Sequence, residues 1–199
     1  MDYLGSLVLG FSIAAIPGPI FFEIIRRVLS KGFWNGFAVL LGEVAGNLAL
    51  LSAVYLGAGI FLSNKQLVSF LFFAGGMILL YLGISALRQK KEDFEKPYSE
   101  KGPTAGPLAA GFCISVSSPI VLAFWISLAG SSLAAMPSAQ AWLSIFLIVL
   151  GFVPFHLILA AVVHHTRRRI PAGFALLLSR FFGLVMCFYG LSFLYRLLS

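Results

Sequence analysis

The chain has 199 residues, of which 60% are hydrophobic and 11% are charged, and its formal net charge is +7. Soluble domains carry about 25% charged residues, so this composition excludes an ordinary soluble protein and predicts an all-α integral membrane protein. The cytoplasmic loops of such a protein collect Lys and Arg, which explains the positive charge without nucleic acid as a partner.

Six apolar segments are long enough to cross a bilayer as helices of about 20 residues. A polar stretch after the third segment is interpreted as a cytoplasmic linker, residues 88–107, between two three-helix membrane units, residues 1–87 and 108–199. A short amphipathic surface helix over Gln89–Phe94 is the alternative for part of this linker. The expected membrane helices are Tyr3–Ile25, Phe37–Phe61, Leu67–Leu87, Leu108–Ala129, Ala141–Val163 and Ala172–Tyr195.

The first expected helix contains Pro17, Gly18 and Pro19, which should break it. A proline inside a helix removes a backbone hydrogen bond and costs about 3 kcal/mol, and in lipid no water replaces the lost partner. The half-helix after such a break begins with unpaired N–H groups, whose partial positive charge can hold a carboxylate. These three residues are therefore candidate substrate-binding residues, with a kink that serves only packing as the alternative. At the end of this helix, Glu23, Arg26 and Arg27 are spaced for local ion pairs or for a gating salt bridge.

The second expected helix contains Glu43 several turns from its ends, where a carboxylate costs about 2.5–3.5 kcal/mol to insert. A carboxyl group that can bind and release a proton is what proton-coupled transport requires, so Glu43 is a candidate proton-coupling residue. A neutral Glu that hydrogen-bonds to another helix is the alternative. Asn47 lies four residues further along on the same helix face and is a candidate substrate-binding residue.

The fourth and fifth expected helices contain the remaining candidates. Pro119, preceded by Ser117 and Ser118, should break the fourth helix at the position that corresponds to Pro19. These three residues are further substrate-binding candidates. His156 follows Pro154 in the fifth helix and is a second proton-coupling candidate, with a packing role as the alternative.

The distribution of Lys and Arg predicts how the chain is oriented in the membrane. Eleven of the 14 basic residues fall in three segments that would lie on the same side, so both termini should face out and the second unit should be inverted. A weak repeat, "GFSI" from Gly10 and "GFCI" from Gly111, agrees with two inverted three-helix repeats whose helices 1 and 4 are broken by proline. The eleven residues are Arg26, Arg27, Lys31, Arg88, Lys90, Lys91, Lys96, Lys101, Arg167, Arg168 and Arg169.

Motifs for enzymatic chemistry are missing from the sequence. It contains no nucleophile–base pair, no phosphate-binding loop and no metal-ligand cluster at useful spacing, so we expect no enzyme, no metal and no cofactor. The two cysteines, Cys113 and Cys187, lie in apolar segments and do not predict an extracellular disulfide framework.

The stretch "IPGPIFFEIIRRVLSKGFWNGFAVLLGEVAGN" resembles the first block of the LysE/RhtB-type amino-acid exporters, part of the LysE superfamily. "SVSSPIVLAFW" (Ser115–Trp125) resembles the second proline motif of that family, and "SRFFGLVMCFYG" (Ser179–Gly190) resembles its last helix. Three polar positions depart from the family pattern. The chain has Ile20 where Asn is common, "SPI" from Ser118 where Asn-Pro-Lys is common, and Asn47 where Asp is common, with Glu43 one turn earlier.

The resemblance implies a secondary transporter that exports a small solute, an amino acid or a derivative, by proton coupling across the bacterial cytoplasmic (inner) membrane. The implied partners are a small-molecule substrate and membrane lipid, and the sequence is compatible with a homodimer. An inorganic cation exporter of the same superfamily is one alternative, although Glu43, Asn47 and carbonyls are its only hard-cation ligands. A membrane thiol–disulfide electron conduit is another, although the repeat partner of Cys113 is Ser12.

Overall fold

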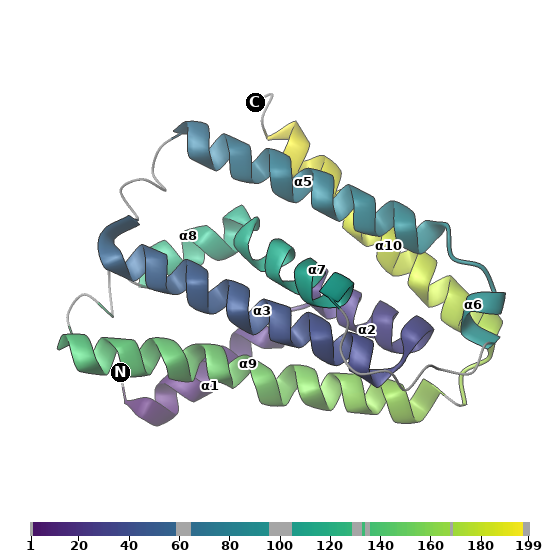
Figure 1. Ribbon diagram of the computed structural model, residues 1–199, viewed down its shortest axis with the longest axis horizontal. Helices are drawn as coiled ribbons and strands as arrows, with labels where there is room; N and C mark the ends of the chain where they lie inside the picture. Colours follow the sequence, from purple (N-terminus) through teal and green to yellow (C-terminus); the bar gives the residue numbers. More distant parts are fainter. Residues whose placement is uncertain are drawn as a thin grey trace.

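Helices make up all the regular structure in the part of the chain that the computed structural model describes, which is residues 2–58, 65–95, 105–128, 133, 136–167 and 169–196 (Figure 1). The predicted all-α fold is confirmed. In chain order, the helices are α1 (Tyr3–Ala14), α2 (Pro19–Lys31), α3 (Phe33–Ala53), the π-helical turn η1 (Val54–Ala58), α5 (Lys65–Leu87), α6 (Glu92–Glu95), α7 (Ala105–Val116), α8 (Pro119–Leu128), α9 (Ser138–Arg167) and α10 (Ala172–Tyr195).

Four helices are long and apolar enough to cross a membrane, and two bent helix pairs raise this number to six if each pair is one span. The four are α3 with η1, α5, α9 and α10. The first bent pair is α1 and α2, which meet at 68°, and the second is α7 and α8, which meet at 59°. The predicted breaks therefore occur at Pro17–Pro19 and before Pro119.

The helix after the first break ends later than the sequence predicted. The expected span Tyr3–Ile25 is divided at the break, and its second half runs on to Lys31. Gly32 then separates α2 from α3 with φ of 88°, a left-handed conformation that glycine adopts without steric cost. As a result α3 begins at Phe33, four residues before the predicted Phe37, and the predicted end at Phe61 lies outside the described residues.

The first part of the predicted linker packs against the helices. It contains the four-residue helix α6, which overlaps the range Gln89–Phe94 proposed for a surface helix, and Phe94 is buried there beside Leu29 of α2 and Ala175 of α10. The hydroxyl of Ser179 donates to the side-chain oxygen of Gln89. Residues 96–104 of the linker lie outside the described residues, and α7 begins at Ala105, three residues before the predicted Leu108.

Small residues bring the helices together in pairs. Gly10 of α1 lies against the Ile148 carbonyl and Gly151 of α9, and Gly111 of α7 lies against the Val39 carbonyl and the Glu43 amide of α3. An added methyl group at Gly10 or Gly111 would overlap these backbone atoms, so the helices touch backbone to backbone, as small residues allow in membranes. Close glycine contacts also join α5 and α10: Gly76 with Gly190, and Gly83 with Gly183.

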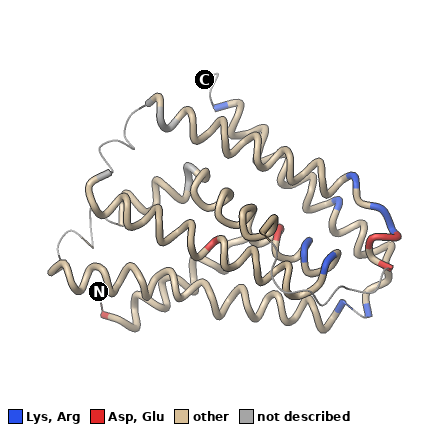
Figure 2. The backbone as a smooth tube through the Cα atoms, in the orientation of Figure 1, with Lys and Arg blue, Asp and Glu red and all other residues tan. Residues whose placement is uncertain are grey.

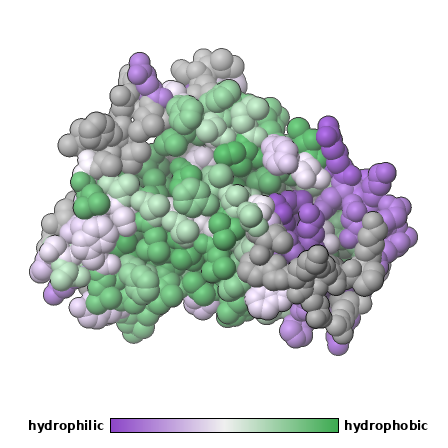
Figure 3. All heavy atoms as spheres, in the orientation of Figure 1, coloured by the Kyte–Doolittle hydropathy of each residue, from purple (hydrophilic) through white to green (hydrophobic). Residues whose placement is uncertain are grey.

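The surface separates into an apolar body and one charged end. Lys and Arg gather at the end of the molecule that contains α6, the end of α2 and the turn between α9 and α10 (Figure 2). The same end is hydrophilic in Figure 3, whereas the adjoining face is largely hydrophobic. Large apolar side chains such as Tyr81, Phe181 and Phe188 are exposed on α5 and α10, as expected for helices that face lipid.

Candidate functional site

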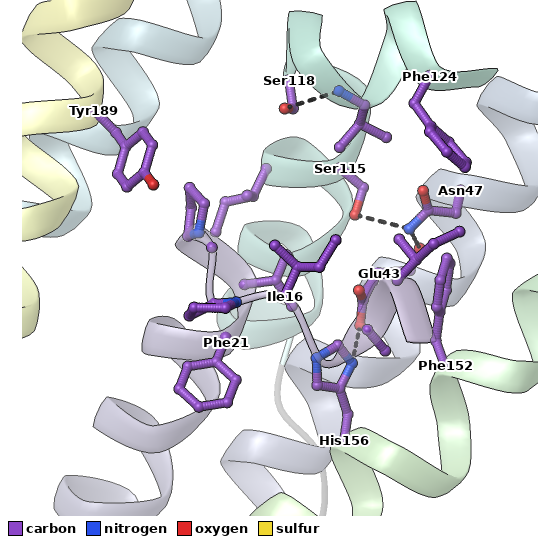
Figure 4. A pocket seen from close by; sticks show the side chains of 18 of the residues that line it. Ile16, Phe21, Glu43, Asn47, Ser115, Ser118, Phe124, Phe152, His156 and Tyr189 are labelled. Carbon is purple, nitrogen blue, oxygen red and sulfur yellow. Dashed lines mark hydrogen bonds and ion pairs between the residues drawn. The ribbon is translucent and has the colours of Figure 1, made fainter. Parts of the chain in front are cut away.

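A cavity of about 320 Å³ lies at the break between α1 and α2 (Figure 4). Residues from α1, α2, α3, α7, α8, α9 and α10 line it, so the helices of both predicted membrane units contribute. Its described lining consists of Ile13, Ala14, Ile16, Pro17, Gly18, Pro19, Ile20, Phe21, Glu43, Asn47, Ile114, Ser115, Ser118, Val121, Phe124, Trp125, Phe152, His156, Tyr189 and Phe193.

The N-terminus of α2 forms one edge of the cavity. Gly18 is its N-cap residue, has extended backbone angles and provides no side-chain cap, and Pro19 has no N–H group. The first helical bond runs from the Phe22 N–H to the Gly18 carbonyl at 3.1 Å, so the N–H groups of Ile20 and Phe21 precede the helical bonding. An uncapped helix N-terminus carries roughly half a positive elementary charge, which favours an anion in the cavity.

Glu43 and His156 form a buried side-chain contact beside this edge. Oε2 of Glu43 lies 2.8 Å from Nδ1 of His156, and their side chains are 8% and 2% exposed. Apart from this contact, neither atom has a hydrogen-bond partner in the described part of the chain. The sequence singled out both residues separately, but their pairing across α3 and α9 is a tertiary contact that no local spacing predicts.

Asn47 of α3, one turn from Glu43, forms hydrogen bonds that link α3 to α7 and α8. Its Nδ2 group donates to the Glu43 carbonyl at 3.1 Å and to the Ser115 hydroxyl at 3.5 Å, while its Oδ1 atom accepts from Trp125 Nε1 at 3.1 Å. Trp125 is a lining residue that the sequence analysis missed as a site residue. It ends the motif from Ser115 to Trp125, which was the available signal.

The three candidates at the second break occupy different positions. Ser118 lines the cavity and accepts a hydrogen bond from the Val121 N–H at 3.4 Å, so it caps α8. Ser117 is not among the described lining residues: its hydroxyl donates to the Cys113 carbonyl and its backbone lies against Gly75 of α5. Pro119 begins α8, and its side chain lies outside the described part of the chain.

Glu23 is fully buried and bonded to two arginines of its own helix. Its carboxylate accepts from Arg26 at 2.8 Å and from Arg27 at 2.6 Å, which confirms the predicted local ion pairs. This cluster belongs to α2 but does not line the cavity. It leaves one positive charge in excess within the membrane unit, one turn beyond the cavity edge.

The described residues offer few side chains for the two alternative functions, an inorganic cation exporter and a thiol–disulfide electron conduit. No group there of three or more His, Cys, Asp or Glu side chains could hold a metal ion. Cys113 and Cys187 are free thiols, on α7 and α10.

Two bent helix pairs around a cavity are an arrangement that is typical of secondary transporters. Comparison with known families agrees: residues 11–197 match the LysE type translocator family, so the chain belongs to that family. The predicted family and the absence of an enzymatic activity are both confirmed by this match, and the chain is a multi-pass bacterial membrane protein.

Two relatives in the family range are similar over part of their length. The "Putative amino acid efflux protein YcgF" of Bacillus subtilis is 31% identical over 69% of this chain. The "Chemotactic transduction protein ChpE" of Pseudomonas aeruginosa is 31% identical over 67% of this chain. In each case the chain covers 66% of the relative, just under two thirds of its length. No solved structure matches the chain.

Proposed function

We propose that this protein exports an amino acid or an amino acid derivative from the bacterial cell, driven by protons that move inward. The observation that carries this proposal is the presence of two opposite charges at one cavity: the uncapped N-terminus of α2 and the Glu43 carboxylate. An amino acid zwitterion complements both, with its carboxylate at the helix N-terminus and its ammonium group at Glu43. The description of YcgF as an amino acid efflux protein supports the direction of transport.

Proton coupling is assigned to the Glu43–His156 pair. Both groups can bind a proton, and both are buried where one of them alone would be a poorly solvated charge. A substrate ammonium group that binds to Glu43 competes with His156 for the same carboxylate. Substrate and proton therefore compete for the same buried pair, which is the competition that antiport requires.

We also propose that the two membrane units are inverted repeats in the inner membrane with both termini outside. The contact between α1 and α9 has a counterpart between α7 and α3, in which glycines meet backbone in both cases. The charged end in Figure 2 carries basic residues from both units, which supports its placement on the cytoplasmic side.

Transport by the purified protein in liposomes tests the proposal. Vesicles loaded with a mixture of labelled amino acids should exchange them with external unlabelled amino acids, and a pH gradient should drive accumulation. Nigericin, which collapses the pH gradient, should abolish accumulation but leave exchange. Accumulation that ignores the gradient would overturn the coupling, and absence of exchange for all amino acids would overturn the substrate assignment.

A further inference from the structure

We infer that the substrate is a neutral α-amino acid with a large apolar side chain, such as leucine, methionine or phenylalanine. This inference rests on the proposed function and narrows it to a substrate class. It is drawn from the side chains that line the cavity, which separate into a small polar group and extended apolar walls.

The polar group accounts for the backbone part of an amino acid. Glu43, Asn47, Ser115 and His156 come from neighbouring turns of α3, α7 and α9 and lie together in Figure 4, next to the break before α2. Asn47 uses both ends of its amide on Ser115, Trp125 and the α3 backbone, which fixes it in place. The positions open to a ligand are therefore the Glu43 carboxylate and the N–H groups at the start of α2.

Apart from the hydroxyl groups of Ser118 and Tyr189, the rest of the lining is apolar and rich in aromatic rings. Phe21, Phe124, Phe152 and Phe193 line the cavity, and Tyr189 of α10 lies across it from Glu43 (Figure 4). Removing apolar surface from water contributes about 25 cal/mol per Å² to the binding free energy. Walls of this kind therefore favour a large apolar side chain and stabilise a small polar one little. At about 320 Å³, the cavity is at the small end of the usual ligand-site range of roughly 300–1,000 Å³, which suits a single amino acid.

Charge excludes the other amino acid classes. Glu43 is the one acidic side chain in the described lining, so a lysine or arginine substrate would bring a second cation without a second carboxylate. The same described lining contains no Lys or Arg, and its one basic side chain, His156, is bonded to Glu43, so the side-chain carboxylate of glutamate or aspartate would also lack a partner. A buried charge without a partner is strongly unfavourable, so discrimination against both classes should be large.

Counterflow in proteoliposomes tests this inference with defined probes. Vesicles that contain unlabelled L-leucine should take up labelled L-leucine, and external L-methionine and L-phenylalanine should compete at similar concentrations. L-threonine, L-lysine and L-glutamate should each compete at least tenfold less well. Leucine amide, which lacks the carboxylate, should also compete at least tenfold less well, because it cannot use the N-terminus of α2.

Variants of the apolar wall connect the preference to the cavity. Phe124→Ala should lower the affinity for leucine about tenfold, corresponding to about 1.4 kcal/mol of binding free energy. The concentration at which threonine competes should stay unchanged. Phe124 is 39% exposed, so this variant should fold. Phe174→Ala on α10 removes a similar ring that is 52% exposed and is not among the described lining residues, and it should behave as the parent.

Each outcome decides between the two proposals. Exchange of threonine, lysine or glutamate in preference to leucine would overturn this inference and leave amino acid export standing. Equal competition by leucine amide would overturn the role of the α2 N-terminus. Absence of exchange for every amino acid, by protein that is monodisperse before reconstitution, would overturn both.

Discussion

The Glu43–His156 contact contains two titratable groups that depend on each other. With 2.8 Å between Oε2 and Nδ1 and almost no exposure, each supplies the counter-charge or hydrogen-bond partner that the other needs in a low-dielectric site. Removing one partner from such a pair leaves the other poorly solvated, whereas an amide in place of the carboxyl retains a polar partner. The amide cannot titrate, so it separates exchange at saturating substrate from proton coupling.

Glu43→Gln should therefore bind substrate at least tenfold more weakly, because the ammonium group loses its carboxylate partner, and at saturating substrate it should exchange but fail to accumulate substrate against a gradient. The neutral amide keeps the shape and hydrogen-bonding capacity of a protonated carboxyl but neither binds nor releases a proton. The measurement is exchange and pH-gradient-driven accumulation of labelled L-leucine in the same vesicles. Glu92→Gln on the exposed helix α6 is the control and should retain both activities. Accumulation by Glu43→Gln at the parent rate, with the parent pH dependence, would rule out this role.

The indole of Trp125 orients Asn47, so removing the indole should lower the stability of the protein. Trp125→Phe removes the Nε1 donor and leaves Oδ1 of Asn47 buried without that bond, which should cost about 1–3 kcal/mol. We expect a lower midpoint of thermal unfolding in detergent. Trp142→Phe, at a residue that is 39% exposed on α9, should leave the midpoint nearly unchanged. Equal midpoints for both variants would show that the Asn47 bond contributes little.

At the scale of helices, the sequence predicts the breaks better than the contacts between helices. Pro17 and Pro19 break the first span because proline acts on the backbone of its own helix, and this is visible in any sequence. The continuation of α2 to Lys31 was missed because Glu23 neutralises charge on Arg26 and Arg27 inside the fold, so a hydropathy criterion ends the helix too early. The packing of distant helices determines the contact of Glu43 with His156 and the role of Trp125. Neither has a local signature in the sequence.

Joining α1 to α2 should remove the anion-binding edge of the cavity. Replacing Pro17, Gly18 and Pro19 together with Ala restores the two missing N–H donors and favours a continuous helix, in which the N–H groups of Ile20 and Phe21 find carbonyl partners. The protein should still insert, and its affinity for L-leucine should fall at least tenfold in counterflow. Pro171→Ala, at the N-cap of α10 and away from the cavity, is the control. Unchanged affinity in the triple variant would mean that the break serves packing.

The backbone contact between α3 and α7 should tolerate no methyl group. Gly111→Ala places a Cβ against the Val39 carbonyl and 3.0 Å from the Glu43 amide, so α7 must move away from α3 at a cost of about 1–3 kcal/mol. Gly106→Ala in the same helix meets nothing within 4 Å and should stabilise α7 slightly, since Ala is the better helix former. Thermal unfolding in detergent should separate the two variants in opposite directions. A stabilising Gly111→Ala would show that the two helices are not in tight contact.

At the scale of the whole molecule, the helix pairs and the charged end both bear on how the two units are oriented in the membrane. The contact of α1 with α9 and that of α7 with α3 are related by exchanging the two units, while α5 and α10 contact each other through Gly76 with Gly190 and Gly83 with Gly183. These contacts are compatible with the proposed inverted repeat. If each unit crosses the membrane three times, an odd number, the second unit starts from the opposite side, so the linker should lie on one side of the membrane and both termini on the other.

Thiol labelling in intact cells tests that arrangement. In a background where Cys113 and Cys187 are replaced by Ala, a cysteine introduced at Glu92 of α6 should be shielded from a membrane-impermeant maleimide. A cysteine at Ala139, exposed at the start of α9, should react, because the proposed orientation places this end outside. Permeabilised cells serve as the control, since both positions are exposed and should then label equally. Labelling at Glu92 but not at Ala139 in intact cells would reverse the orientation, and labelling at both or at neither would contradict a linker and an α9 N-terminus on opposite sides of the membrane.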